Sequence, residues 1–491
     1  MLPAPSSRFS VFSLRQLPRL LAVWLLGLVC VAGADSPPNL VVIHVDDLGW
    51  ADIGCYGSQY FRTPHIDGLA ERGARFTQGY AAAAVCSPTR AALLTGRYPA
   101  RIGITDWIRA TFQGGEMPED GQNPSGWIEN PNRRLAVPEN PLWLEHEELT
   151  LAEALAPRGY RSVHIGKWHL GFEGYYPEDQ GFDWNLGGCD FGQPPSFFDP
   201  YVNPRLPGGI PTLEPRQEGE YLTDREADEA VAFIQQHADQ PFFLHWAPYA
   251  VHTPIQAKPE LIEKYQAIEP PGPQIDPVYA AMVHSLDEGV GKVIQALREN
   301  QLLERTLILF TSDNGGLMGY TSSAPLYSGK GYAFEGGIRV PFILAWPGVT
   351  DEGQIHDEPV ISMDVFATLL DVANVPLPDD RAIDGRSLVP LLRGQADRLD
   401  RESLIWHFPH YRHAGFDPYS VIRQGEWKLI QFYDPPRLEL YNLAIDPGET
   451  TNYLRVRRQL ANQLRDRLQE ELQQMGARIP RQNPRWIGHA N

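Results

Sequence analysis

The stretch from residue 39 to residue 45 is Asn39-Leu40-Val41-Val42-Ile43-His44-Val45, a nearly continuous run of apolar and β-branched side chains. Such a run is typical of a strand that is buried on both faces of a parallel sheet. A second run of this kind occupies residues 306–312. The first run ends in Asp46-Asp47 and the second in Asp313-Asn314. Because functional groups of an open parallel sheet gather beyond the carboxyl ends of its strands, we expect these polar side chains to lie together.

Two further strand-like runs also end in polar residues. Residues 161–165 lead into Lys167 and His169, and residues 241–247 lead into His252. Helical stretches separate the runs, and the alternation of strand and helix continues for about 300 residues, which is typical of an α/β protein. The sequence therefore predicts an α/β sandwich with a large, mostly parallel central sheet.

The alternation is interrupted in two places. Residues 108–147 are rich in Gly, Pro and Asn and lack a clear period, which predicts a long surface excursion that lines the mouth of a pocket. Near the C-terminus the sequence favours an antiparallel hairpin over 419–432 and a charged helix over about 453–475. We expect a catalytic α/β domain over residues 35–400 and a smaller C-terminal subdomain, with an antiparallel sheet and a helix, over residues 401–491.

The first 34 residues have the pattern of a secretory signal peptide. Three arginines precede an apolar run over residues 20–31, and the small residues Ala32-Gly33-Ala34 follow it. The alternative is an uncleaved membrane anchor, but the run is short for a spanning helix. We therefore expect an exported protein, periplasmic or secreted, that spans no membrane once residues 1–34 have been removed.

Charge and cysteine content restrict the partners. The formal net charge of −19 argues against nucleic acid, and it requires that any anionic substrate be met by a local basic pocket. Removal of the signal would leave Cys55, Cys86 and Cys189. Because an exported protein with an odd number of cysteines has at least one unpaired thiol, this count favours a chemical role for one of them.

The segment Cys86-Ser87-Pro88-Thr89-Arg90 has the pattern of a helix start. Pro88 suits the first helical position, and Ser87 is a good N-cap. Cys86 is then expected just ahead of the helix, facing unpaired N–H groups and the positive end of the helix dipole, which is a place for an anion. The alternative is a small buried thiol before an ordinary helix.

The residues at the predicted strand ends suggest a metal and an anion. Asp46, Asp47, Asp313 and Asn314 are hard oxygen donors that suit Ca²⁺ or Mg²⁺, although each pair alone would be equally typical of turns and helix caps. The basic residues that could bind the anion are Arg90, Lys167, His169, His252 and Lys330, the last of which lies between two glycines. The alternative explanations are exposed loop positions or, for a histidine, a position in the core.

Together these motifs resemble those of the type I sulfatases over nearly the whole chain after the signal. The matching motifs are Asp46-Asp47-Leu48-Gly49, Cys86-Ser87-Pro88-Thr89-Arg90, Gly166-Lys167-Trp168-His169, His252-Thr253-Pro254, Asp313-Asn314-Gly315 and Gly329-Lys330-Gly331, extended by residues 335–341, 383–385 and 439–443. The resemblance implies an alkaline-phosphatase-like α/β sandwich and a hydrolase of sulfated sugars or aryl sulfates. It departs from many relatives at Thr89, where they have Ser, outside the C-x-P-x-R core.

The resemblance also implies a modification and a set of roles. In that family a formylglycine-generating enzyme oxidises the motif cysteine, here Cys86, and the hydrated aldehyde attacks sulfur. His252 and Lys330 are implied to hold the sulfate and to protonate the leaving oxygen. His169 is implied to deprotonate the second hydroxyl, and Arg90 and Lys167 to orient the diol.

The implied metal is Ca²⁺, with Mg²⁺ as the other possibility. Its ligands by resemblance are Asp46, Asp47, Asp313, Asn314 and the modified Cys86.

Two other functions remain open at the level of the sequence. A phosphonate or phosphate ester hydrolase could use the same scaffold and nucleophile. An unmodified Cys86 would instead leave a non-catalytic binder of sulfated glycans. The segment 406–413, with three histidines, an arginine and three aromatic residues, predicts either a wall of the substrate pocket or a hydrophobic seam between the two domains.

Overall fold

Strand β1 (Asn39–Val45) lies inside an eight-stranded sheet whose strand order is β11-β2-β10-β9-β1-β8-β6-β7. It pairs in parallel with β9 (Thr306–Ser312) on one side and with β8 (Phe242–Ala247) on the other. Every residue of β1 and β9 is buried, because both faces of these strands are covered. The prediction of a doubly buried pair of parallel strands is confirmed.

The computed structural model describes residues 1, 37–115, 117–270, 272, 275–412 and 417–488. Apart from Met1, the expected signal peptide at residues 1–34 lies outside these ranges. Among the described residues, none of the helices combines the length and the apolar character that crossing a membrane requires.

The remaining strands make the sheet mixed but mostly parallel. Strand β10 runs antiparallel to β9 and β2, whereas the other pairs of neighbours are parallel, as the sequence predicts. These strands are β2 (Ala74–Phe76), β6 (Arg161–Gly166), β7 (Trp184–Leu186), β10 (Phe342–Ala345) and β11 (Gln354–His356).

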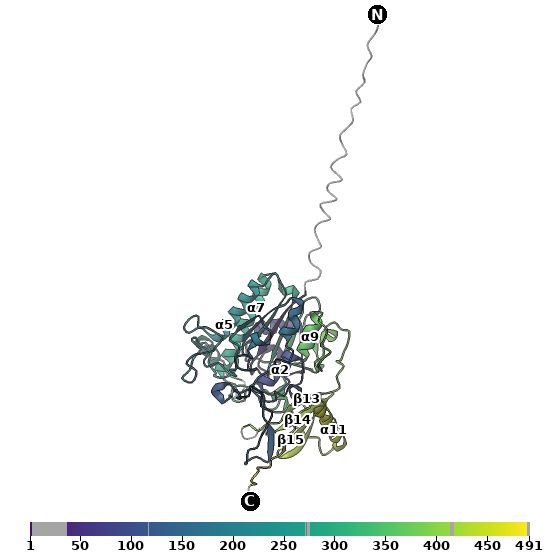
Figure 1. The fold of residues 1–491 in the computed structure, drawn as a ribbon. Helices are drawn as coiled ribbons and strands as arrows, with labels where there is room; N and C mark the ends of the chain where they lie inside the picture. The colour runs from purple at the N-terminus through teal and green to yellow at the C-terminus, as the bar shows by residue number, and fades with distance from the viewer. Residues whose placement is uncertain (2–36, 116, 271, 273–274, 413–416, 489–491) are drawn as a thin grey trace. The chain divides into compact units, whose positions relative to one another are not determined.

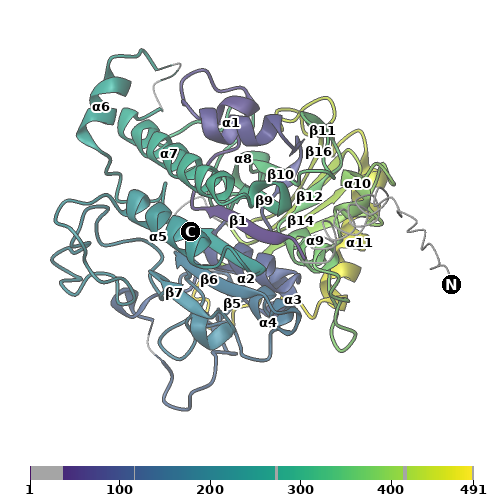
Figure 2. The ribbon, with the colours of Figure 1, turned by 90° about the horizontal axis from the view of Figure 1, so that it is seen from above.

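Helices cover both faces of the sheet, and the alternation of side chains along β1 divides the core between them. Val41 and Ile43 belong to one apolar cluster and Leu40 and Val42 to another. In Figure 2, α5 and α7 lie in the left half of the view and α9 toward the right, and the first two contribute to the first cluster and α9 to the second. The first cluster packs against α1 (Pro64–Glu71), α5 (Leu222–Gln236), α6 (Pro259–Gln266) and α7 (Pro277–Glu299), and the second against α2 (Cys86–Thr95), α4 (Leu151–Leu155), α9 (Asp364–Val372) and α10 (Val389–Leu392).

A four-stranded antiparallel sheet follows the large one in sequence, and Figure 1 shows its strands beside α11 (Arg458–Gln474). The expected hairpin is present, and the helix is shorter at its N-terminal end than the sequence predicts. Tyr80 and Ile338 share an apolar cluster with this sheet, so its core continues into the α/β part. The strands are β13 (Leu404–Phe408), β14 (Tyr419–Gln424), β15 (Trp427–Tyr433) and β16 (Pro436–Asn442).

The excursion over residues 108–147 contains a small sheet of its own. Its strands β4 (Trp127–Ile128) and β5 (Leu135–Pro138) pair with each other, and β5 also pairs with β17 (Arg481–Gln482) near the C-terminus. The last strand of the chain is therefore attached to the excursion. Further short elements include the helices α3 (Pro99–Ile102) and α8 (Glu335–Ile338) and the paired strands β3 (Gly79–Tyr80) and β12 (Val360–Ile361).

Candidate active site

Four neighbouring strands deliver the polar residues to one edge of the sheet. Asp46-Asp47 follow β1, Asp313-Asn314 follow β9, Lys167 and His169 follow β6, and His252 comes shortly after β8. Because these strands are parallel neighbours, their carboxyl ends lie together, and the predicted convergence is confirmed by the contacts below.

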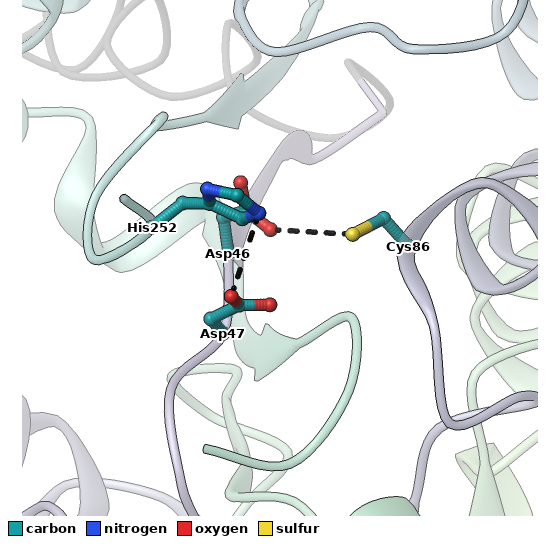
Figure 3. A group of neighbouring side chains, drawn as sticks. All are labelled: Asp46, Asp47, Cys86 and His252. Atoms are coloured by element: carbon teal, nitrogen blue, oxygen red, sulfur yellow. Dashed lines mark hydrogen bonds and ion pairs between the residues drawn. The ribbon is translucent and has the colours of Figure 1, made fainter. Parts of the chain in front are cut away.

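The acidic residues and the thiol form a compact group. Ligand atoms of Asp46, Asp47, Cys86 and His252 all lie within 4.8 Å of one another. Figure 3 shows their side chains pointing toward a common space, with Cys86 Sγ 3.7 Å from Asp46 Oδ1 and His252 Nε2 3.6 Å from Asp47 Oδ2. This set could hold a metal ion.

We call Asp46, Asp47, Asp313 and Asn314 together the acidic edge, and both Asn314 and Asp313 contact Asp47. Asn314 Nδ2 donates to Asp47 Oδ1 over 2.8 Å, and Asp313 Oδ1 accepts the Asp47 N–H at 3.2 Å. The other oxygen of Asp313 is bound by Arg90. Asp47 itself has φ 59°, in the left-handed region that Asp tolerates better than most residues, so its backbone is strained where its carboxylate is presented.

Three cations balance the three carboxylates. Lys167 Nζ lies 2.7 Å from Asp46 Oδ2, and Lys330 Nζ lies 2.6 Å from Asp47 Oδ1. Arg90 Nε donates to Asp313 Oδ2 over 2.9 Å. Buried charges are tolerated only in such pairs, because each unpaired ion would carry a large desolvation cost.

The pKa values follow from this burial and pairing. Burial, opposed by Lys167 and reinforced by the neighbouring carboxylates, raises the pKa of Asp46. Although burial acts in the opposite sense, the Asp47 carboxylate holds the pKa of Lys330 above its usual value, and Arg90 holds that of Asp313 below its own. Burial raises the pKa of Cys86 to about 12, so its sulfur is a protonated thiol at neutral pH, which is a poor nucleophile.

Helix α2 begins two residues earlier than the sequence predicts. Val85 is the N-cap and Cys86 the first helical residue, so the thiol lies in the first turn. The Ser87 hydroxyl does not cap the helix. It donates to the His169 carbonyl over 2.9 Å and accepts the Ile108 N–H over 2.9 Å, and it thereby ties the nucleophile helix to two pocket loops.

Hydrogen bonds determine which ring nitrogen of each histidine is available. His169 Nε2 lies 2.7 Å from the Ile108 carbonyl and must carry the proton, which leaves the buried Nδ1 unprotonated and without a partner among the described residues. His252 Nδ1 likewise donates to the Thr253 carbonyl over 2.9 Å. Burial lowers the pKa of both rings, that of His252 to about 3, and therefore both are uncharged.

The chemistry-bearing side chains open into a pocket of about 170 Å³. Cys86, His169, His252 and Lys330 line it, whereas Arg90 and Lys167 lie behind it, 1% and 0% exposed. Gly192 forms one wall, where a Cβ would come within 2.7 Å of His169 Cε1. Gln113 also lines it, from the excursion over 108–147 that the sequence places at a pocket mouth. Sequence reasoning missed three further lining residues, which carry no motif: Val85, Trp107 and Gln193.

The segment 406–413 divides between the apolar core and the pocket that holds Cys86. Its first part is strand β13, where Trp406 packs in the core and the buried His407 contacts Ser420. His410 is 4% exposed and hydrogen-bonds to Thr105 over 2.7 Å, whereas Arg412 lines the pocket. Residue 413 lies outside the described residues.

Comparison with known proteins places this geometry in a family. Residues 38–375 match the family described as Sulfatase, and residues 326–478 match the C-terminal region of N-sulphoglucosamine sulphohydrolase. The chain belongs to the sulfatase family. This protein is 32% identical to a protein named Sulfatase from Formosa agariphila, over 86% of this chain and 85% of the relative. It is also 36% identical to N-acetylgalactosamine-6-sulfatase from Mus musculus, over 77% and 70% of the two chains.

Solved structures support the same conclusion for the fold. The crystal structure of Ps i-CgsB aligns with a TM-score of 0.73 and 28% identity, over 92% of this chain and 95% of the other. Phosphonate monoester hydrolase of Agrobacterium radiobacter aligns with a TM-score of 0.62 and 21% identity, over 89% and 96% of the chains, which shows a shared fold alone. The alkaline-phosphatase-like sandwich expected from the sequence is confirmed.

Proposed function

We propose that this sulfatase removes sulfate from a sulfated carbohydrate, or from an aryl sulfate, with Cys86 oxidised to formylglycine and a divalent metal bound beside it. The observation that carries the proposal is the convergence of Cys86 with Asp46, Asp47 and His252 at the start of α2, inside a small cationic pocket. Membership of the sulfatase family supplies the reaction class.

The residues present fit a hard divalent cation. Asn314 Oδ1 is buried without a hydrogen-bond partner among the described residues, although its own Nδ2 is bonded to Asp47. His252 Nε2, an acceptor, faces the acceptor Asp47 Oδ2 at 3.6 Å, and either a cation bound to Asp47 or a proton on Nε2 would relieve this contact. We assign Ca²⁺, with Mg²⁺ as the alternative, to Asp46, Asp47, Asp313, Asn314 and the modified Cys86. The metal would supply charge that polarises a sulfate oxygen.

Oxidation of Cys86 would supply a hydrated aldehyde, whose hydroxyl replaces the inert thiol as the nucleophile. The sulfur atom in this structure occupies the position of that hydroxyl. Arg90 and Lys167 lie behind the site, and through Asp313 and Asp46 they keep the acidic edge in place and offset its charge. The aldehyde implies a formylglycine-generating enzyme as a partner during maturation.

The proton-transfer roles follow from the geometry of the pocket. Lys330, held in its charged form by Asp47, would grip a sulfate oxygen and protonate the leaving alcohol. His252 lines the same wall, and it would assist in binding sulfate once Nε2 is protonated, a form that the neighbouring Asp47 carboxylate favours. His169 also lines the pocket, and its buried Nδ1 is unprotonated, so it would act as the base that takes a proton from the modified residue.

Mass spectrometry and turnover together test the proposal. Protein from a host with the modifying enzyme should carry formylglycine at residue 86 and should release more sulfate than phosphate or phosphonate from matched 4-nitrophenyl esters. Cys86→Ala should fold and lose turnover, whereas Cys189→Ala, which alters another buried thiol, should retain it. Full activity of a protein whose residue 86 is an unmodified thiol would overturn the proposal.

We also propose that the protein is exported to the periplasm or secreted, because residues 1–34 have the charge and hydropathy pattern of a signal peptide. The mature N-terminus recovered from the native host should then follow Ala34. A mature protein that still begins at Met1 would contradict export by this route.

A further inference from the structure

A second pocket, of about 400 Å³, adjoins the pocket that holds Cys86. The two share Trp107 and Arg412 as lining residues, so a ligand anchored at Cys86 can extend past Trp107 into the second space. The Trp107 ring lies 6.3 Å from the His169 ring, between centroids, which places it directly beside the reacting groups. The excursion over residues 108–147 and the segment after β13 form most of the second pocket.

Guanidinium groups held over aromatic rings dominate the charge of this pocket. The Arg109 guanidinium carbon lies 5.5 Å from the centroid of the Trp107 ring, and that of Arg133 lies 4.6 Å from the centroid of the Tyr411 ring. Within the described part of the chain, no carboxylate lies within ion-pair distance of Arg109 or Arg133. Neither arginine is therefore in an ion pair with a described carboxylate, in a molecule whose net charge is −19.

Two carboxylates also line the pocket, and the three arginines outnumber them. Asp106 accepts the Trp107 N–H over 2.9 Å, and Glu139 accepts the Gly126 N–H over 2.8 Å. Burial, with Arg109 and Arg412 adding to it, lowers the pKa of His410 to about 3, and its ring is therefore uncharged. The positive charge of the pocket comes from arginine alone.

We propose that this second pocket binds a further anionic group of the substrate, carried on the sugar next to the one whose sulfate is cleaved. The inference rests on the proposed function and narrows it to acidic oligosaccharides. Arg109 and Arg133 would bind the anion, because guanidinium groups pair with sulfate or carboxylate oxygens through two N–H donors. Trp107 would place its apolar ring against the sugar between the two anions. The second anion is a sulfate or a uronate carboxylate, and the two share this chemistry.

Binding to a catalytically silent enzyme tests the inference without turnover. The probes are sulfated disaccharides that differ only in the second sugar: neutral, sulfated, or carrying a carboxylate. With Cys86→Ala as background, calorimetry should show that at least one dianionic probe binds more tightly than the neutral-tailed one. Arg109→Gln and Arg133→Gln should each reduce that advantage about tenfold, as expected for the loss of one charge-assisted contact. Comparison of the sulfated probe with the carboxylated probe shows which of the two anions the pocket binds more tightly.

Arg393→Gln is the matched control, since Arg393, like Arg109, is exposed and has its guanidinium over a tryptophan ring, that of Trp346, away from the site. It should leave binding of every probe unchanged. Equal binding of neutral-tailed and dianionic probes, or an advantage that survives both substitutions in folded protein, would overturn the inference. Because the single variants are measured separately, a folding failure of one leaves the other decisive. Failure of the proposed function looks different: the wild-type enzyme would release no sulfate from any ester, while the binding pattern would stand.

Discussion

The amide of Asn314 donates to Asp47 Oδ1 over 2.8 Å and leaves its own oxygen buried without a hydrogen-bond partner among the described residues. An unsatisfied buried acceptor costs free energy, so its persistence next to two carboxylates indicates that it is reserved for a ligand. An oxygen atom that lies beside two carboxylates is suited to bind a cation.

We therefore expect Asn314→Ala to weaken Ca²⁺ binding at least tenfold, by analogy with losses at other metal sites, and to lower activity in parallel. Calorimetric titration of metal-free protein measures the first effect. Asn39→Ala is the control, because Asn39 Oδ1 is likewise buried and unpartnered but belongs to the opposite end of β1. Unchanged Ca²⁺ affinity in Asn314→Ala would exclude this residue from the metal site.

Arg90→Lys should lower kcat/KM by about a hundredfold or more, because a lysine ammonium cannot reproduce the planar set of contacts that Arg90 makes. Its Nε donates to Asp313 Oδ2, and its Nη1 donates to the Lys167 carbonyl over 2.8 Å. One substitution thus loosens both an acidic residue and a cationic one.

A second arginine that contacts a carboxylate, Arg101, provides a control that separates the effect on catalysis from general destabilisation. Arg101 binds both carboxylate oxygens of Asp384, at 2.9 and 2.7 Å, outside the pocket that holds Cys86. Arg101→Lys should lower the melting temperature and leave kcat/KM close to that of the wild type. If both variants lost activity in proportion to stability, Arg90 would have only a structural role.

The strand ends could be predicted from sequence because their signals are local. An apolar β-branched run followed by Asp-Asp or Asp-Asn fixes both the strand and the position of its polar end, and parallel pairing then brings Asp46 and Asp313 together. The walls of the pocket had no such signal. Trp107 and Gln193 reach the site from irregular loops, where no periodicity relates sequence position to location.

The start of α2 shows a different limit. Ser87 has the residue type of an N-cap, yet its hydroxyl contacts the His169 carbonyl and the Ile108 N–H, residues that are distant in sequence. Tertiary contacts thus displaced a local preference. The segment 406–413 shows the same limit. Trp406 is buried and Arg412 lines the pocket because of residues elsewhere in the chain, which the sequence of the segment does not reveal.

His410→Ala should destabilise the fold by about 2 kcal/mol, since it removes a buried ring and leaves the Thr105 hydroxyl without its partner. Because the ring is uncharged, the preference for a second anion should survive in the folded fraction. Thermal melts and the binding assay above measure the two effects. A double-mutant cycle with Thr105→Val isolates the hydrogen bond, and loss of anion preference without loss of stability would contradict this assignment.

The last prediction concerns Glu226, a buried carboxyl on α5 that accepts the Tyr249 N–H over 3.3 Å and lies close to Gly166. Burial raises the pKa of Glu226 to about 8 from 4.5. Between these two pH values the folded protein retains a proton that the unfolded chain releases, so the free energy of unfolding should fall as pH rises, by up to about 1.4 kcal/mol per pH unit. Glu226→Gln cannot release this proton, and its advantage over the wild type should grow from pH 5 to pH 8 in urea unfolding. Values near pH 3 serve as the internal control, because below its ordinary pKa of 4.5 Glu226 is largely uncharged in the unfolded chain as well as in the fold. Parallel stability curves for the two proteins over this range would show that Glu226 is not protonated in the fold.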